Sequence, residues 1–181
     1  MNNPFLPKYP LPVDLKESYA QMLRVNLAGE EGAVAIYKGQ LSKTHQEHEK
    51  KEIEEMLSHE TEHCKLFQRE MRIHQSRPSL FSLLWNPLGY GVGRLSMSFG
   101  YHYAMAQTEA IEEVIVEHYQ TQIDQTDLQS TWGKLLKQCQ EDEAHHQHIG
   151  KENSDTSLTL DLWRVLTRLG TRTCIALAKR I

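Results

Sequence analysis

The sequence predicts an all-α protein built around two similar helix hairpins, and three observations lead to this fold class. Proline occurs only before residue 13 and at Pro78 and Pro87, so two long stretches lack this helix breaker. Within those stretches apolar residues recur with the period of a helix, and no alternating strand pattern competes. The acidic residues are 18 glutamates and six aspartates, and glutamate is the carboxylate that helices accommodate better.

The periodicity predicts five helices, at residues 14–42, 45–74, 94–124, 127–150 and 158–180. Between Asn153 and Thr156 the pattern is interrupted by residues that can cap the last helix at its N-terminus. The apolar stretch 78–93 contains two prolines and three glycines. We therefore expect it to be a connection between the hairpins.

The whole chain, 1–181, is expected to form one domain with an extended segment at residues 1–12. A net charge of −4 gives no reason to expect a nucleic-acid partner. No secretory or transit signal is recognisable at the N-terminus, and no run of apolar residues is long enough to span a bilayer. The three cysteines lie far apart, which is typical of reduced thiols in a cytosolic compartment.

A repeated pattern of glutamate and histidine predicts a metal site. The motif Glu-x-x-His occurs twice, which alone is close to chance for this composition. However, each copy follows a leading glutamate by 30 or 31 residues, and the two halves are offset by 82 or 83 residues. This is the ligand set of a ferritin-like four-helix bundle with a dinuclear carboxylate site. The predicted ligands are Glu30, Glu60, His63, Glu112, Glu143 and His146.

The residue types indicate which metal the site takes. Residues i and i+3 share a helix face, so each Glu-x-x-His offers a carboxylate and an imidazole to one ion. Four carboxylates balance the charge of two ferrous ions, and this mixed set suits iron or manganese better than a closed zinc site. We expect two iron ions. Tyr37 and Tyr119, each seven residues after a leading glutamate, and Asn26 are candidates for supporting the ligands.

Other assignments compete for some of these positions. Asp142 and His145 also have acid-x-x-His spacing. We prefer Glu143 and His146, because the apolar residues Leu136 and Cys139 share their helix face and apolar residues mark the face that points into the bundle. His118 fits either the core or the surroundings of the ligands, and the sequence does not decide between them.

Residues 59–63 match the His-Glu-x-x-His pattern of zinc proteases. The second half of the repeat has Asp142 where His59 stands, and a single-metal protease leaves three of the glutamates without a role. The repeat therefore argues against a protease.

Several stretches resemble the demethoxyubiquinone hydroxylase family, from about residue 19 to the C-terminus. They include L-R-V-N-L-A-G-E-E-G-A-V-A-I-Y-K-G-Q, H-E-T-E-H-C-K-L-F, A-I-E-E-V-I-V-E-H-Y-Q-T-Q and E-D-E-A-H-H. The resemblance implies a di-iron monooxygenase that hydroxylates the ring of a polyprenyl methoxy-benzoquinol with molecular oxygen in ubiquinone biosynthesis. The family's ligands fall on the same six residues. The chain departs from the family at Leu27, Glu31 and Thr171.

The resemblance also implies partners and a location. A polyprenyl substrate lies in the bilayer, and the apolar residues between Leu80 and Met105 could contact it. We expect a peripheral protein on the cytoplasmic face of the cell membrane, with a homo-oligomer and contacts to other ubiquinone-biosynthesis proteins as further expectations. The alternatives are another ferritin-like di-iron oxidase, a ferroxidase, or a rubrerythrin-type peroxidase. The electron donor stays open.

Overall fold

The computed structural model describes residues 13–80 and 82–180, which form six helices and no strand. The helices are α1 (Val13–Leu41), α2 (Glu47–Ile73), α3 (Ser82–Ser98), α4 (Tyr101–Ile123), α5 (Thr131–Glu152) and α6 (Leu158–Arg180). The all-α prediction is confirmed. The expected extended segment at residues 1–12 lies outside the described residues.

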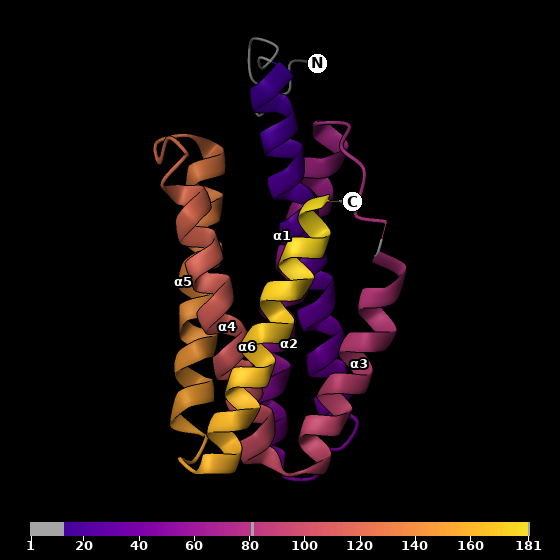
Figure 1. Cartoon of the computed structure of the whole chain (residues 1–181), viewed down its shortest axis with the longest axis vertical. Helices are drawn as coiled ribbons and strands as arrows, with labels where there is room; N and C mark the ends of the chain where they lie inside the picture. The colour runs from indigo at the N-terminus through magenta and orange to yellow at the C-terminus, as the bar shows by residue number, and fades with distance from the viewer. Residues whose placement is uncertain (1–12, 81, 181) are drawn as a thin grey trace.

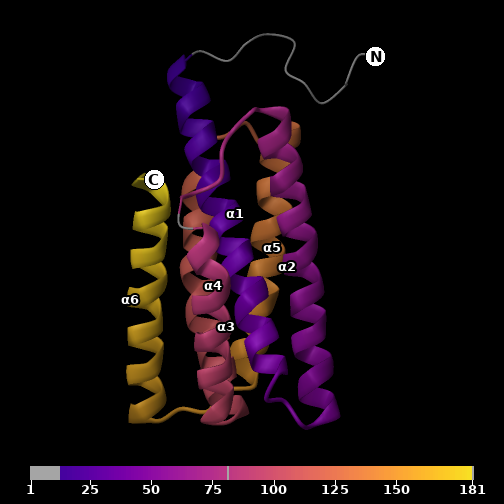
Figure 2. The same cartoon turned by 90° about the vertical axis from the view of Figure 1, so that its right-hand side faces the viewer.

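The helices form layers around α1 and α4 (Figures 1 and 2). α1 packs against α2, and α4 packs against α5. α6 lies on the outer side away from α2 and α5 and packs mainly on α4. α3 runs alongside α1. This arrangement places helices from both halves of the repeat around one centre.

The predicted connection at 78–93 and the start of the predicted helix 94–124 are wrong, because residues 82–98 form the separate helix α3. α3 ends before Gly100, whose φ of 115° lies in the left-handed region that favours glycine, and α4 begins immediately afterwards. Pro87 lies inside α3 on its exposed side. The glycines that suggested a loop instead allow α3 to approach α1 closely.

Gly39, Gly89 and Gly93 make this approach possible. A Cβ atom on Gly93 would lie 2.0 Å from the carbonyl oxygen of Ile36, and one on Gly39 would lie 2.2 Å from that of Tyr90. These obstacles are backbone atoms, which cannot rotate out of the way as side chains do. The two helices therefore touch through their backbones.

We expect Gly93→Ala to force α1 and α3 apart and to lower the free energy of unfolding by about 1–3 kcal/mol. Gly91→Ala is the matched control on the same helix, because a Cβ there meets nothing within 4 Å. Removing a glycine from a helix should leave that variant neutral or more stable by about 0.5–1 kcal/mol. Urea unfolding of the iron-free proteins tests both, and equal midpoints for the two variants would contradict the close contact.

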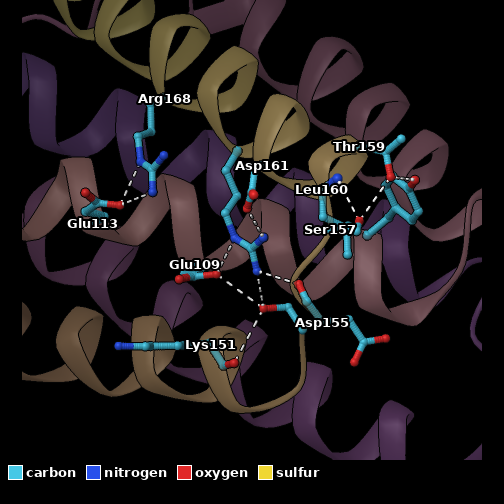
Figure 3. A network of polar contacts seen from close by, with 12 residues as sticks. Glu109, Glu113, Lys151, Asp155, Ser157, Thr159, Leu160, Asp161 and Arg168 are labelled. Carbon is cyan, nitrogen blue, oxygen red and sulfur yellow. Dashed lines mark hydrogen bonds and ion pairs between the residues drawn. The ribbon is translucent and has the colours of Figure 1, made fainter.

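Regularly spaced ion pairs hold α6 against α4. Arg164 donates to Glu109 at 2.7 Å, Arg168 donates to Glu113 at 2.7 Å (Figure 3), and one turn further Arg172 donates to Glu117 at 3.2 Å. Each pair joins residues four positions beyond the last, so the arginines share one helix face.

The ion pairs differ in burial along α6. The Arg164 side chain is only 9% exposed and also donates to the Ser154 hydroxyl and the Asp155 carbonyl, whereas Arg172 is 54% exposed. The ion pairs at the N-terminal end of α6 are therefore less screened by water than the one at Arg172.

Two apolar clusters lie above and below the middle of the bundle. One gathers around Leu23, Phe67 and Leu136, and the other around Ile53, Met56 and Met105. Along every helix of the two hairpins, the predicted ligands lie between residues of these clusters. The order of apolar residues and predicted ligands along each helix thus places the site in the centre of the bundle.

Candidate metal centre

The six predicted ligands converge from four helices. Glu30 comes from α1, Glu112 from α4, and the two Glu-x-x-His pairs from α2 and α5. All six side chains belong to residues that are no more than 4% exposed. Such burial of four carboxylates requires strong compensation, because an isolated buried charge is unfavourable.

The donor atoms of these residues form two groups of four that could each hold a metal ion. Glu60 and Glu143 belong to both groups, and within each group the donor atoms lie within 4.8 Å of one another. The first group adds Glu30 and His63, and the second adds Glu112 and His146. The shared carboxylates are therefore the glutamates of the two Glu-x-x-His motifs, which can bridge neighbouring ions.

Several atoms in the centre have no hydrogen-bond partner. They are one carboxylate oxygen each of Glu30, Glu60 and Glu143, together with Nδ1 of His63. Each of them lies 3.1–3.3 Å from an oppositely charged group, yet none makes a hydrogen bond, which is rare for buried polar atoms and needs an explanation. A cation satisfies all of them at once, so the donor set fits metal ions.

Burial, followed by the negative charge of Glu143, raises the pKa values of Glu60 and Glu112 well above their ordinary range. Burial acts in the same direction on Glu143, but contacts with His146 and His63 outweigh it and lower its pKa to about 2. Burial lowers the pKa of His63, yet Cys139, Glu143 and Glu30 outweigh it and raise the net value far above the ordinary range. In the metal-free protein, protons therefore balance the charge of the carboxylates.

The two histidines present the same ring nitrogen to the centre. Nδ1 of His63 lies 3.3 Å from Glu30 and 3.2 Å from Glu143, and Nδ1 of His146 lies 3.1 Å from Glu60. Nε2 of each ring faces outward. Nδ1 is therefore the nitrogen placed to bind a metal.

Each outward nitrogen has a partner from the other half of the repeat. Nε2 of His63 lies 3.1 Å from a carboxylate oxygen of Asp142, and Nε2 of His146 lies 3.1 Å from Nδ1 of His59. Such outer partners keep the proton on Nε2 and leave Nδ1 free to bind a metal. Sequence reasoning weighed Asp142 and His59 only as ligands. His59 and Asp142 each stand directly before the glutamate of a Glu-x-x-His motif, and they are offset by the 83 residues of the repeat. This equivalence was the signal in the sequence for their shared role.

Two tyrosines connect the leading glutamates across the bundle. The Tyr37 hydroxyl donates to Glu112 at 2.8 Å, and the Tyr119 hydroxyl donates to Glu30 at 2.6 Å. Each tyrosine thus donates a hydrogen bond to the leading glutamate of the other half of the repeat. Asn26 instead exchanges hydrogen bonds with Gln122, so its support of the ligands stays a prediction.

The other candidates lie away from the centre or beside it. His145 is exposed, and His118 is half-buried against Gln122. Leu27 is buried in an apolar cluster. Glu31 is half-buried, and burial raises its pKa.

A cavity of about 420 Å³ reaches the centre from the side of α3 and α6. Its wall includes all four predicted carboxylate ligands. The rest is largely apolar, with Trp85, Leu88 and Val92 from α3 and Trp163 and Leu166 from α6. The volume lies in the range of small-molecule sites. An apolar organic molecule can therefore reach the carboxylates.

We expect Asp142→Ala to weaken ferrous iron binding about 10–100-fold, because the His63 ring loses the partner that orients it. Glu141→Ala is the matched control, since the neighbouring Glu141 is exposed and, among the described residues, forms an ion pair only with Lys137. Anaerobic titration with ferrous iron measures both affinities. Equal affinities in the two variants would contradict a role for Asp142 in metal binding.

Comparison with known proteins identifies the family. The family model described as ubiquinone biosynthesis protein COQ7 matches residues 17–178. The chain belongs to this family.

COQ7 relatives occur in eukaryotes and bacteria. The chain is 35% identical to a Dictyostelium discoideum protein over 170 residues, 89% of this chain and 76% of that protein. It is 30% identical to a human protein over 167 residues, which are 89% of this chain and 77% of that protein. Both are named mitochondrial NADPH-dependent 3-demethoxyubiquinone 3-hydroxylase. A Rhodospirillum rubrum protein named 3-demethoxyubiquinol 3-hydroxylase is 34% identical over 150 residues, 82% of this chain and 69% of that protein. The resemblance seen in the motifs is confirmed.

Proposed function

We propose that this COQ7 protein is a di-iron monooxygenase that hydroxylates the ring of a demethoxyubiquinol-type polyprenyl quinol with molecular oxygen. The observation that carries the proposal is the apolar cavity whose wall contains Glu30, Glu60, Glu112 and Glu143. An iron-storage protein needs no apolar route to its carboxylates, whereas a quinol ring does. The names of the relatives support the same substrate class.

Iron held by the six residues would supply the activation of oxygen. The chain's own residues hold the reaction in place. Tyr37 and Tyr119 fix the positions of Glu112 and Glu30. Trp85 and Leu88 exclude water from the ring and orient it against the carboxylates. Hydroxylation inserts one oxygen atom into a ring C–H bond and reduces the other to water, so a reductant supplies two electrons and two protons.

The test is turnover by the purified, iron-loaded protein. A short-tailed demethoxyquinol, a reductant and isotopically labelled oxygen are supplied, and the product is analysed by mass spectrometry. We expect a product that has gained one labelled oxygen atom. Iron oxidation without any change in the quinol would support a ferroxidase instead.

We further propose that the protein takes its substrate from a membrane surface. No described helix is long and apolar enough to cross a bilayer. However, α3 and α6, which both contribute to the cavity wall, expose many large apolar side chains, and such patches mark interaction surfaces. Those exposed are Leu83, Leu84, Leu88, Tyr90, Val92 and Leu95 on α3, and Leu158, Leu162, Val165, Leu166, Leu169 and Leu177 on α6.

Flotation with liposomes tests this surface. The double substitution Leu83→Glu and Leu84→Glu should move the protein from the lipid fraction to the soluble fraction, because charge disfavours insertion into the interface. Leu128→Glu is the control, since Leu128 is similarly exposed between α4 and α5. A wild-type protein that stays wholly soluble, with anionic lipid present, would contradict the membrane proposal.

A further inference from the structure

His118 is the only histidine that lines the cavity among the described residues. It lies on α4 with Gln107, Ile111 and Ile115, which form one stripe of cavity-facing residues. Glu112 lies beside this stripe. His118 stands six positions after Glu112, which places the two about 9 Å apart along the helix axis. A ring held near the carboxylates is therefore within reach of His118.

A chain of hydrogen bonds fixes the imidazole. Asn26 and Gln122 exchange two hydrogen bonds, and the same Gln122 amide nitrogen lies 2.7 Å from Nε2 of His118. An amide nitrogen only donates, so Nε2 of His118 accepts and carries no proton. The neutral ring must then carry its proton on Nδ1. This N–H makes no hydrogen bond to any described residue.

The ring stays neutral at physiological pH. Burial lowers the pKa of His118 to about 4, and the positive charge of Lys179 on α6 acts in the same direction. A neutral imidazole cannot act as a counter-ion for the carboxylates of the centre. What it offers an uncharged ligand in the cavity is a single N–H donor in a largely apolar wall.

We propose that Nδ1–H of His118 donates a hydrogen bond to an oxygen substituent of the quinol ring and so determines which ring carbon faces the metal centre. This role rests on the proposed function. Apolar packing alone lets a flat ring turn in its plane, whereas one fixed donor selects a single orientation. His118 is thus a specificity-determining residue that lies outside the predicted ligand set, and its neighbours Gln122 and Asn26 position it.

Ligand binding gives the first test. A short-tailed demethoxybenzoquinone is titrated into the metal-loaded protein, and the fluorescence of Trp85 and Trp163 in the cavity wall reports binding. The oxidised ring is chosen because its carbonyl oxygens only accept hydrogen bonds. We expect His118→Leu to weaken binding about tenfold and His118→Gln, which keeps an N–H donor, to restore most of the affinity. His145→Leu, on the exposed face of α5, is the matched control and should bind normally.

Turnover gives the second test. His118→Leu should raise KM and yield ring-hydroxylated isomers, while its iron content equals that of the wild type. Unchanged affinity and a single product in His118→Leu would overturn the role. Equal losses in His118→Leu and His118→Gln, with reduced iron content, would show a purely structural role and overturn it too. Absence of quinone binding and turnover in the wild type would instead overturn the proposed function, and this role with it.

Discussion

Glu143→Gln is expected to abolish quinol hydroxylation, with turnover lowered about a thousandfold or more, since metal ions contribute several kcal/mol to such reactions. Glu143 belongs to both four-residue groups, so its loss affects both ions at once. The amide has nearly the shape of the carboxylate but carries no charge. The fold should persist, because the amide fills the same space as the carboxylate, although it loses the charged contacts with His63 and His146.

The measurement combines turnover, iron content and thermal unfolding of the metal-free protein. Glu141→Gln is the control, because Glu141 lies two residues away on the exposed side of α5. We expect the control to match the wild type in all three. Full turnover in Glu143→Gln with two bound irons would contradict a shared carboxylate at this position.

The stability of the metal-free protein is expected to fall as the pH rises from about 5 to 8. Glu60 and Glu112 have raised pKa values when folded, so above the ordinary value of 4.5 the folded chain binds more protons than the unfolded chain. The free energy of unfolding then decreases with pH up through the folded pKa. The raised pKa of His63 acts in the same direction above its ordinary value of 6.5. Glu143, with a pKa of about 2, opposes this only below pH 4.5.

Ferrous iron should reverse the fall in stability with rising pH. Metal binding displaces the protons, so the affinity increases with pH, and free iron at a hundred times Kd adds about 3 kcal/mol of stability per site. Urea midpoints measured anaerobically between pH 5 and 8, with and without iron, give the two curves. The curves should diverge as the pH rises. Parallel curves would mean that iron does not replace protons on these carboxylates.

The repeat allowed the sequence to predict which six residues gather at the centre of the bundle, and their role as metal ligands stays a prediction. Paired spacing placed Glu30 with Glu112 and Glu60 with Glu143, because a residue's position along a helix determines which face it occupies. The predicted helix boundaries agree less closely with the structure. α5 begins at Thr131, where the Ser130 hydroxyl accepts a hydrogen bond from the amide of Gly133, several residues after the predicted start at 127.

Two features could not be predicted from local pattern. α3 was mistaken for a connection because Gly89 and Gly93 usually favour turns, whereas here they serve a backbone contact with α1 that only the folded chain reveals. The outer partners Asp142 and His59 were weighed as ligands because sequence spacing shows which helix face a residue occupies. It does not show how far its side chain lies from the metal centre. The cavity is likewise formed mainly by α1, α3, α4 and α6, with Glu60 of α2 and Glu143 of α5, and no single segment shows it.

The most direct measurement of the central claim is Mössbauer spectroscopy of the protein after anaerobic loading with ferrous iron and exposure to oxygen. If Glu60 and Glu143 are shared by two neighbouring ions, each chain holds two ferric ions that are magnetically coupled. A spectrum of isolated, uncoupled iron at one ion per chain or less would contradict it.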